Sequence, residues 1–262
     1  MKKYIGIGIA VMLAALTLAV LAGCSEYSHV VGSKNMETRQ FDYSGFTRIE
    51  ISNAFNVDIT KSDTYSISVT LNDNLFNELT VSKSGDTLYM HMNPYLRLGS
   101  STQRAEITLP ELNSLKISGA CQAVVTGFQS AGTLDLEADG ASGIQINDLK
   151  ATDTKITALG VSHVTGSLIT DNADFQVTGV SNIKLTGSAA KMQLNVVGAS
   201  HAALVDFIVG DASVTAEGAS TVEIDAHGTL DVDVSGASTL RYSDNPKLGR
   251  VEVSGASTLS RR

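Results

Sequence analysis

Eight near-identical tripeptides carry hydroxyl or thiol groups that could serve as nucleophiles. Each runs glycine, small residue, serine, with a cysteine in the first copy. A nucleophilic serine needs a base within hydrogen-bond reach, and the sequence contains no Gly-x-Ser-x-Gly turn of the serine-hydrolase type. A hydroxyl repeated in every copy instead predicts a structural ladder of small buried residues and no catalytic residue. The ladder comprises Cys121, Ser142, Ser162, Ser181, Ser200, Ser220, Ser238 and Ser257.

Two histidines are spaced in a way that raises the question of a metal site. His163 and His201 follow the serine of the third and fifth tripeptides, and Asn182 holds the same place in the fourth. On stacked strands this spacing separates the two rings by about 10 Å. One metal ion binds histidine nitrogens at about 2.0–2.1 Å, so the sequence predicts surface histidines, no metal and no cofactor.

Carboxylates could act as acid and base on a polysaccharide, as they do in many β-helix enzymes. The acidic residues that precede the glycines are interleaved with lysine, arginine and neutral residues. The net charge of −8, which becomes −10 without Lys2 and Lys3, would also repel a polyanionic substrate. We therefore expect no enzyme, with a polysaccharide-acting one as the least favoured alternative. The acidic residues concerned are Asp135, Glu137, Asp174, Asp231, Asp233 and Glu252.

Composition narrows the range of partners. The 262-residue chain is acidic, has no Trp and is 5 % aromatic. Nucleic-acid binding needs a basic face and favours aromatic stacking platforms, so nucleic acid is excluded as a partner. The length is enough for one large all-β domain with a sizeable core.

The elements that position these residues are specified by an internal repeat with a period of 18–21 residues. Apolar residues stand four and two positions before each glycine, and a polar residue stands between them, as in Leu136, Glu137 and Ala138. This alternation is typical of a strand with one buried face. The glycines are predicted to form the repeat corners, where positive φ or close backbone approach is needed. They are Gly119, Gly140, Gly160, Gly179, Gly198, Gly218, Gly236 and Gly255.

A coil of about 19 residues buries its apolar face only by stacking on its neighbours. The repeat thus predicts an all-β, single-domain parallel β-helix over residues 41–262. We expect right-handed winding, which the column pattern itself does not determine. Residues 119–262 form the regular repeats, and residues 41–118 form irregular N-terminal coils and a cap, with Asn53 in place of a corner glycine. At about 19 residues a coil, this segment would make about eleven or twelve coils.

Both ends of the chain carry further signals. The N-terminus resembles a bacterial lipoprotein signal, with Lys2 and Lys3, an apolar run and then Leu-Ala-Gly directly before Cys24. We therefore expect residues 1–23 to be removed. We expect Cys24 to carry a lipid that anchors the protein in the outer membrane. A membrane-spanning segment is the alternative. The polar residues of 24–40 predict a flexible tether. The last coil, ending at Arg262, would expose strand edges, so self-association through this C-terminal edge is a further expectation.

The stretch FDYSGFTRIEI (residues 41–51), the stretch FNVDIT (residues 55–60) and the later Gly-Ala-Ser repeats resemble the family named putative auto-transporter adhesin, head GIN domain. The order of a lipoprotein signal followed by such a domain is similar to that of many Bacteroidetes members of the family. The resemblance implies a β-helical fold and a cell-envelope location, and it supplies no catalytic motif. We expect a non-catalytic adhesin or binding module with a protein or glycan partner, on the cell-surface or periplasmic face of the membrane. A periplasmic binding or regulatory subunit is the alternative.

Overall fold

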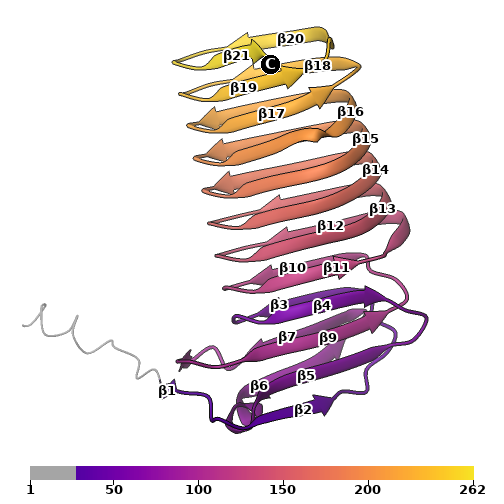
Figure 1. Ribbon diagram of the computed structural model, residues 1–262, viewed down its shortest axis with the longest axis vertical. Helices are drawn as coiled ribbons and strands as arrows, with labels where there is room; N and C mark the ends of the chain where they lie inside the picture. The colour runs from indigo at the N-terminus through magenta and orange to yellow at the C-terminus, as the bar shows by residue number, and fades with distance from the viewer. Residues whose placement is uncertain (1–27) are drawn as a thin grey trace, which may run out of the picture.

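The computed structural model describes residues 28–262 and shows one β-solenoid (Figure 1). The fold is 70 % strand and 3 % helix, and it winds through about 7 turns as a single domain. The prediction of an all-β, single-domain parallel β-helix is confirmed. The predicted signal peptide 1–23 and Cys24 lie outside the described residues.

The regular coils stack through parallel pairing along the long axis. Register is kept from coil to coil, so that Leu136, Ile156 and Phe175 lie beside one another in the core. The strands are β10 (Ser114–Ser118), β11 (Gln122–Thr126), β12 (Gln129–Ala138), β13 (Gly143–Ala158), β14 (His163–Gly179), β15 (Asn182–Gly198), β16 (His201–Gly218), β17 (Thr221–Ala226), β18 (Thr229–Val234), β19 (Thr239–Ser243), β20 (Lys247–Val253) and β21 (Thr258–Arg261).

Each regular coil has two arms, joined by a sharp corner on one side and a rounded bend on the other (Figure 1). The corner is the glycine tripeptide. The bend lies inside the long strands β13, β14, β15 and β16, where register shifts mark bulges, as between Ile146 and Leu149. Bulges bend a strand while keeping it in the ladder. One strand can therefore follow nearly a whole coil.

The N-terminal part has a less regular order. Its elements are β1 (Ser28–Val30), β2 (Met36–Gln40), β3 (Arg48–Ser52), β4 (Asn56–Lys61), β5 (Ser66–Asn72), the 3-10 helix η1 (Asp73–Glu78), β6 (Leu79–Ser84), β7 (Thr87–Met92), β8 (Leu96–Leu98) and β9 (Gln103–Leu109). Strands β3 and β4 lie between two other coils. They pair in parallel with β10 and β11 on one side and with β7 and β9 on the other. The chain thus adds its second coil beneath its first.

Antiparallel strands close the N-terminal end of the solenoid. Strand β5 pairs antiparallel with both β2 and β9, and β6 pairs antiparallel with β7. These hairpins and η1 use residues that do not form further coils, so the expectation of about eleven or twelve coils is corrected to about 7 turns. This cover pairs β5 with β9 and β6 with β7, whose edges an open solenoid would expose.

The flexible tether expected for 24–40 is corrected over the described part of that range. Strand β1 pairs in parallel with β8, and β2 pairs with β5. The segment between β1 and β2 is also held by side chains, because the Asn72 amide donates to Ser33 O at 2.7 Å and accepts from Thr102 N at 2.8 Å. Non-local pairing overrides the polar composition of this stretch. Among residues 28–262, no helix has the length and apolar character needed to cross a bilayer.

Candidate functional site

The repeat glycines occupy the sharp corners of the coils. All eight have positive φ, between 71° and 93°. A Cβ atom on Gly179 would lie 2.4 Å from the carbonyl oxygen of Gly160 in the coil before it. Backbone therefore packs directly on backbone at this edge, and the next residue, Val180, donates its N–H to that same oxygen at 2.8 Å. The glycines are Gly119, Gly140, Gly160, Gly179, Gly198, Gly218, Gly236 and Gly255.

The small residues after the corners form a hydrogen-bonded column inside the fold. The Ser162 N–H donates to Ser181 Oγ at 3.2 Å, and the Ser181 hydroxyl donates to Thr178 O at 2.9 Å. The Ser181 hydroxyl is thus bonded to backbone groups on both sides, and neither partner is a base that could activate it. Ser257, in the last coil, is half-buried. The fully buried members are Cys121, Ser142, Ser162, Ser181, Ser200, Ser220 and Ser238.

Cys121 closes this column at its N-terminal end. Its side chain is fully buried, and its Sγ accepts the Phe55 N–H at 3.4 Å. Burial raises the pKa of the Cys121 thiol above its ordinary value. The thiol form therefore predominates at neutral pH, and nucleophilic chemistry needs the thiolate.

The histidines and most of the acidic residues stay apart from any catalytic arrangement. His163, Asn182 and His201 stand in one register column, one per coil, as the spacing predicts. Within residues 28–262, no group of three His, Cys, Asp or Glu side chains could hold a metal ion. Glu137 forms an ion pair with Lys116 at 3.3 Å.

Three of the remaining acidic residues lie near the C-terminal end. Glu252 pairs with Arg250 at 2.8 Å, and the Arg250 guanidinium lowers the pKa of that carboxyl. Asp231 accepts the Arg250 N–H at 2.7 Å, and Asp233 stands beside Glu252 in register. Arg250 thus contacts Glu252 through its guanidinium and Asp231 through its backbone N–H.

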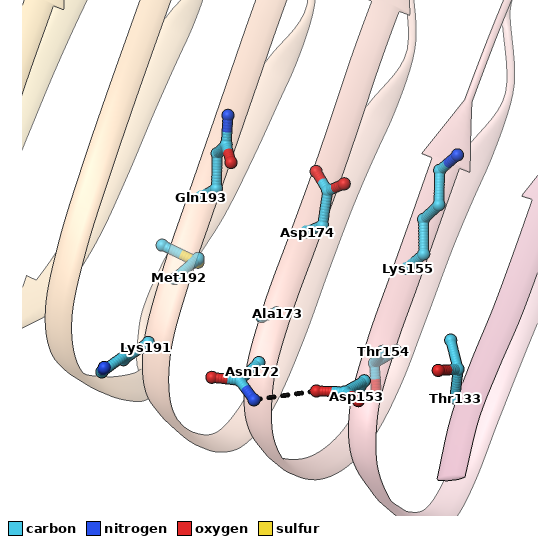
Figure 2. Close-up of a pocket in the computed structure, with 10 residues that line it drawn as sticks. All are labelled: Thr133, Asp153, Thr154, Lys155, Asn172, Ala173, Asp174, Lys191, Met192 and Gln193. Carbon is cyan, nitrogen blue, oxygen red and sulfur yellow. Dashed lines mark hydrogen bonds between the residues drawn. The ribbon is translucent and has the colours of Figure 1, made fainter.

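A shallow groove of about 480 Å³ crosses the outward face of β13, β14 and β15 (Figure 2). Its upper row holds Lys155, Asp174 and Gln193, which are register neighbours on successive coils. Asp135 stands next to Lys155 on the preceding strand. The row therefore presents side chains of both charges and an amide across successive coils.

A second row lies nearer the rounded bends (Figure 2). Asp153, Asn172 and Lys191 are register neighbours there, and the Asn172 amide donates to Asp153 Oδ1 at 2.8 Å. Between the two rows, the buried side chains Thr154 and Met192 form the floor. The lining offers hydrogen-bond donors, acceptors and charges of both signs, and it has no aromatic platform.

Alignment on the corner glycines places the upper row in one polar column but predicts no binding site there, and it does not include the second row. Lys155, Asp174 and Gln193 fall in the polar column five residues before each corner glycine. Asp153, Asn172 and Lys191 stand seven residues before it, beyond the clear alternation that defined the strands. Extending the same column alignment by two residues would have found them.

The fold and the repeat identify the family. Residues 45–246 match the family described as putative auto-transporter adhesin, head GIN domain, and the chain belongs to it. The description of this family is of adhesin type, which points to the cell surface or envelope. No curated protein matches the sequence.

Solved structures share the same solenoid. A crystal structure of a putative lipid binding protein from Parabacteroides distasonis superposes with a TM-score of 0.86 at 18 % identity, covering 90 % of this chain and 100 % of that one. A putative adhesin from Parabacteroides merdae gives a TM-score of 0.83 at 16 % identity, covering 90 % of this chain and 99 % of that one. At these identities the likeness concerns the fold alone.

Proposed function

We propose that this chain is a non-catalytic, lipid-anchored adhesin-type protein of the outer membrane, which binds a partner protein through the groove on β13, β14 and β15. The observation that carries the proposal is the pair of polar rows in Figure 2. Their residues are exposed or half-buried, are held in register by three consecutive coils and form no nucleophile–base or metal arrangement. A rigid, pre-formed surface of this kind lowers the ordering cost of binding.

The chemistry of the groove favours a protein as the ligand. Lys155 stands beside Asp174 in the upper row, and Asp153 and Lys191 stand at the two ends of the second row, on either side of Asn172. Complementary charge patterns of this kind confer specificity between protein surfaces. The groove has no aromatic side chain on which a sugar ring would stack.

The position of β1 supports an anchor at the closed end of the solenoid. Ser28, the first residue of β1, follows Cys24 by four residues, which span at most about 14 Å when extended. Strand β1 lies at the N-terminal end of the structure, and the C-terminus lies at the opposite end (Figure 1). A lipid on Cys24 would therefore hold the capped end near the bilayer and leave the groove-bearing coils farther from it.

The proposal is tested by binding of the purified domain, residues 28–262, to epithelial cell layers. These residues contain the whole core. We expect binding to untreated layers, loss of binding after the layers are treated with protease, and at least a tenfold loss for the double variant Lys155→Glu/Lys191→Glu. Periodate, which oxidises glycans, should leave binding intact.

The matched control is Lys184→Glu, which reverses an exposed lysine on the other arm of β15. It should bind as the wild type does. Wild-type binding by the double variant Lys155→Glu/Lys191→Glu would contradict the proposed groove. Binding that is sensitive to periodate and resistant to protease would identify a glycan as the ligand and overturn the choice of a protein partner.

A further inference from the structure

The C-terminal end of the solenoid exposes residues that every other coil buries. Val251 and Val253 stand in register with Val232 and Val234, which are 2 % and 0 % exposed. Val251 and Val253 themselves are 42 % and 44 % exposed, because no described element lies on top of β20. This end, formed by β20 and β21, is visible at the top of Figure 1.

Strand β20 also presents an unpaired backbone edge. The Ser254 N–H donates to Val234 O in the coil beneath. Backbone groups of successive residues in a strand point to opposite sides, so the N–H and C=O groups of Val251 and Val253 face the open end. Edge groups of this kind are a template for pairing with another strand.

Within residues 28–262, the only surface of a second copy that matches this end is its own C-terminal end. The N-terminal end is formed by β2, β5 and β6, whose antiparallel order differs from the cross-section of a regular coil, so head-to-tail stacking would not continue the coil register. Tail-to-tail contact brings together two identical cross-sections, and such a contact is closed by a two-fold axis. It would bury the exposed valines of both copies at once.

Charge selects one register for this contact. When two copies of β20 run antiparallel with Val251 on the two-fold axis, Arg250 of each copy stands opposite Glu252 of the other. Moving the axis by one residue in either direction places Arg250 opposite Arg250 or Glu252 opposite Glu252. Opposite charges across a strand pair stabilise it and like charges destabilise it.

We propose that two copies of this chain join tail to tail through antiparallel pairing of β20, with Val251 on the axis and Arg250 opposite Glu252. The pairing uses β20 because β21 places Arg261 beside the terminal Arg262, and both are exposed. The inference is independent of the proposed ligand groove, whose three coils lie away from this end (Figure 1).

Cysteine cross-linking tests the register. Directly opposed residues in a hydrogen-bonded antiparallel pair have Cα atoms about 5.5 Å apart, which a disulfide can bridge. In residues 28–262 carrying Val251→Cys, a mild thiol oxidant should therefore produce a covalent dimer. Val253→Cys is the matched control, and it should stay monomeric on denaturing gels because Val253 faces Gly249 of the other copy. The native Cys121 is buried and does not compete.

Charge exchange tests the same contact by sedimentation velocity. We expect the wild type to dimerise, and Arg250→Glu to raise the dimer dissociation constant at least tenfold, because Glu then faces Glu. The double variant Arg250→Glu/Glu252→Arg should restore dimerisation to within about threefold. Arg104→Glu, an exposed arginine reversal on β9 at the capped end, is the matched control and should leave the dimer unchanged.

Three outcomes would overturn the proposal. The first is a monomer at every protein concentration. The second is a dimer whose stability does not respond to Arg250→Glu. The third is cross-linking of Val253→Cys in preference to Val251→Cys. Circular dichroism of each variant should match the wild type, since the substituted side chains are exposed and lie outside the core.

Discussion

From β12 onward every coil pairs in parallel with the coil that precedes it in the sequence, whereas residues 28–109 combine parallel and antiparallel strands. In the regular coils, one backbone arrangement is repeated at each corner, and the serine column adds a hydrogen bond from coil to coil. In the N-terminal part, individual side chains hold the chain in place, as Asn72 does between Ser33 and Thr102.

The two regions therefore differ in the kind of substitution that should destabilise them. In the regular coils the corners leave no space, so small additions of volume should be costly. In the N-terminal part the turns at Gly45 and Gly85 are open, and polar side chains around η1 hold the neighbouring chain in place. The first region suits a rigid binding face, and the second suits a closed end joined to an anchor.

The largest expected loss of stability comes from the replacement of a corner glycine. Gly179→Val introduces a side chain at φ +93° against Gly160 O, so it should lower the free energy of unfolding by about 3 kcal/mol or more. Gly85→Val, at φ +60° in the turn before β7, meets no atom within 4 Å and should cost only about 1–2 kcal/mol. Denaturant unfolding of both variants measures the contrast, and equal losses would show that corner packing is unimportant.

A smaller effect is expected in the serine column. Ser181→Ala removes the acceptor of the Ser162 N–H and the donor to Thr178 O, which should cost about 1–3 kcal/mol. Ser181→Cys should retain more of the stability, because Cys121 already accepts an N–H at the equivalent place in the first regular coil. The same unfolding measurement compares them. If Ser181→Cys were the less stable variant, the column would depend on the hydroxyl itself.

The smallest effect is a local pH dependence in the N-terminal part. The Ser33 hydroxyl donates to the Asp73 carboxylate and lowers its pKa, with further help from Asn35. A lowered folded-state pKa means that this stabilisation is present above the ordinary Asp value and is lost as pH falls through the folded value. The amide NMR signals of Ser33 and Asn35 should therefore shift with a midpoint below the ordinary Asp pKa. Asp73→Asn should abolish that shift, and a midpoint above the ordinary value would contradict the contact.

The regular coils could be predicted from sequence because their signals are local and repeated. The alternation before Gly140, with Leu136 and Ala138 buried around Glu137, is enough to assign strand, face and corner. Stacking then follows from the constant period. The upper row of the groove follows from the same alignment, since Lys155, Asp174 and Gln193 share one column.

The N-terminal part could not be predicted in the same way because its order depends on distant pairing. Nothing within 48–61 indicates that these residues lie between the coils of 87–109 and 114–126. Strand β2 is mostly exposed and lacks alternation, so its pairing with β5 leaves no pattern in METRQ. The second row of the groove was missed for a related reason, because Asp153 and Asn172 lie near the bend.

An adhesin-type role for this chain requires that the coils display the groove at the cell surface. Intact cells would be treated with a membrane-impermeant amine-reactive biotin reagent, and the labelled lysines would be mapped, with lysed cells as the control. Labelling of Lys155 and Lys191 in intact cells is the result that this account predicts. Protection of both lysines until lysis would place the groove in the periplasm, contradict surface display and favour a periplasmic binding or regulatory subunit.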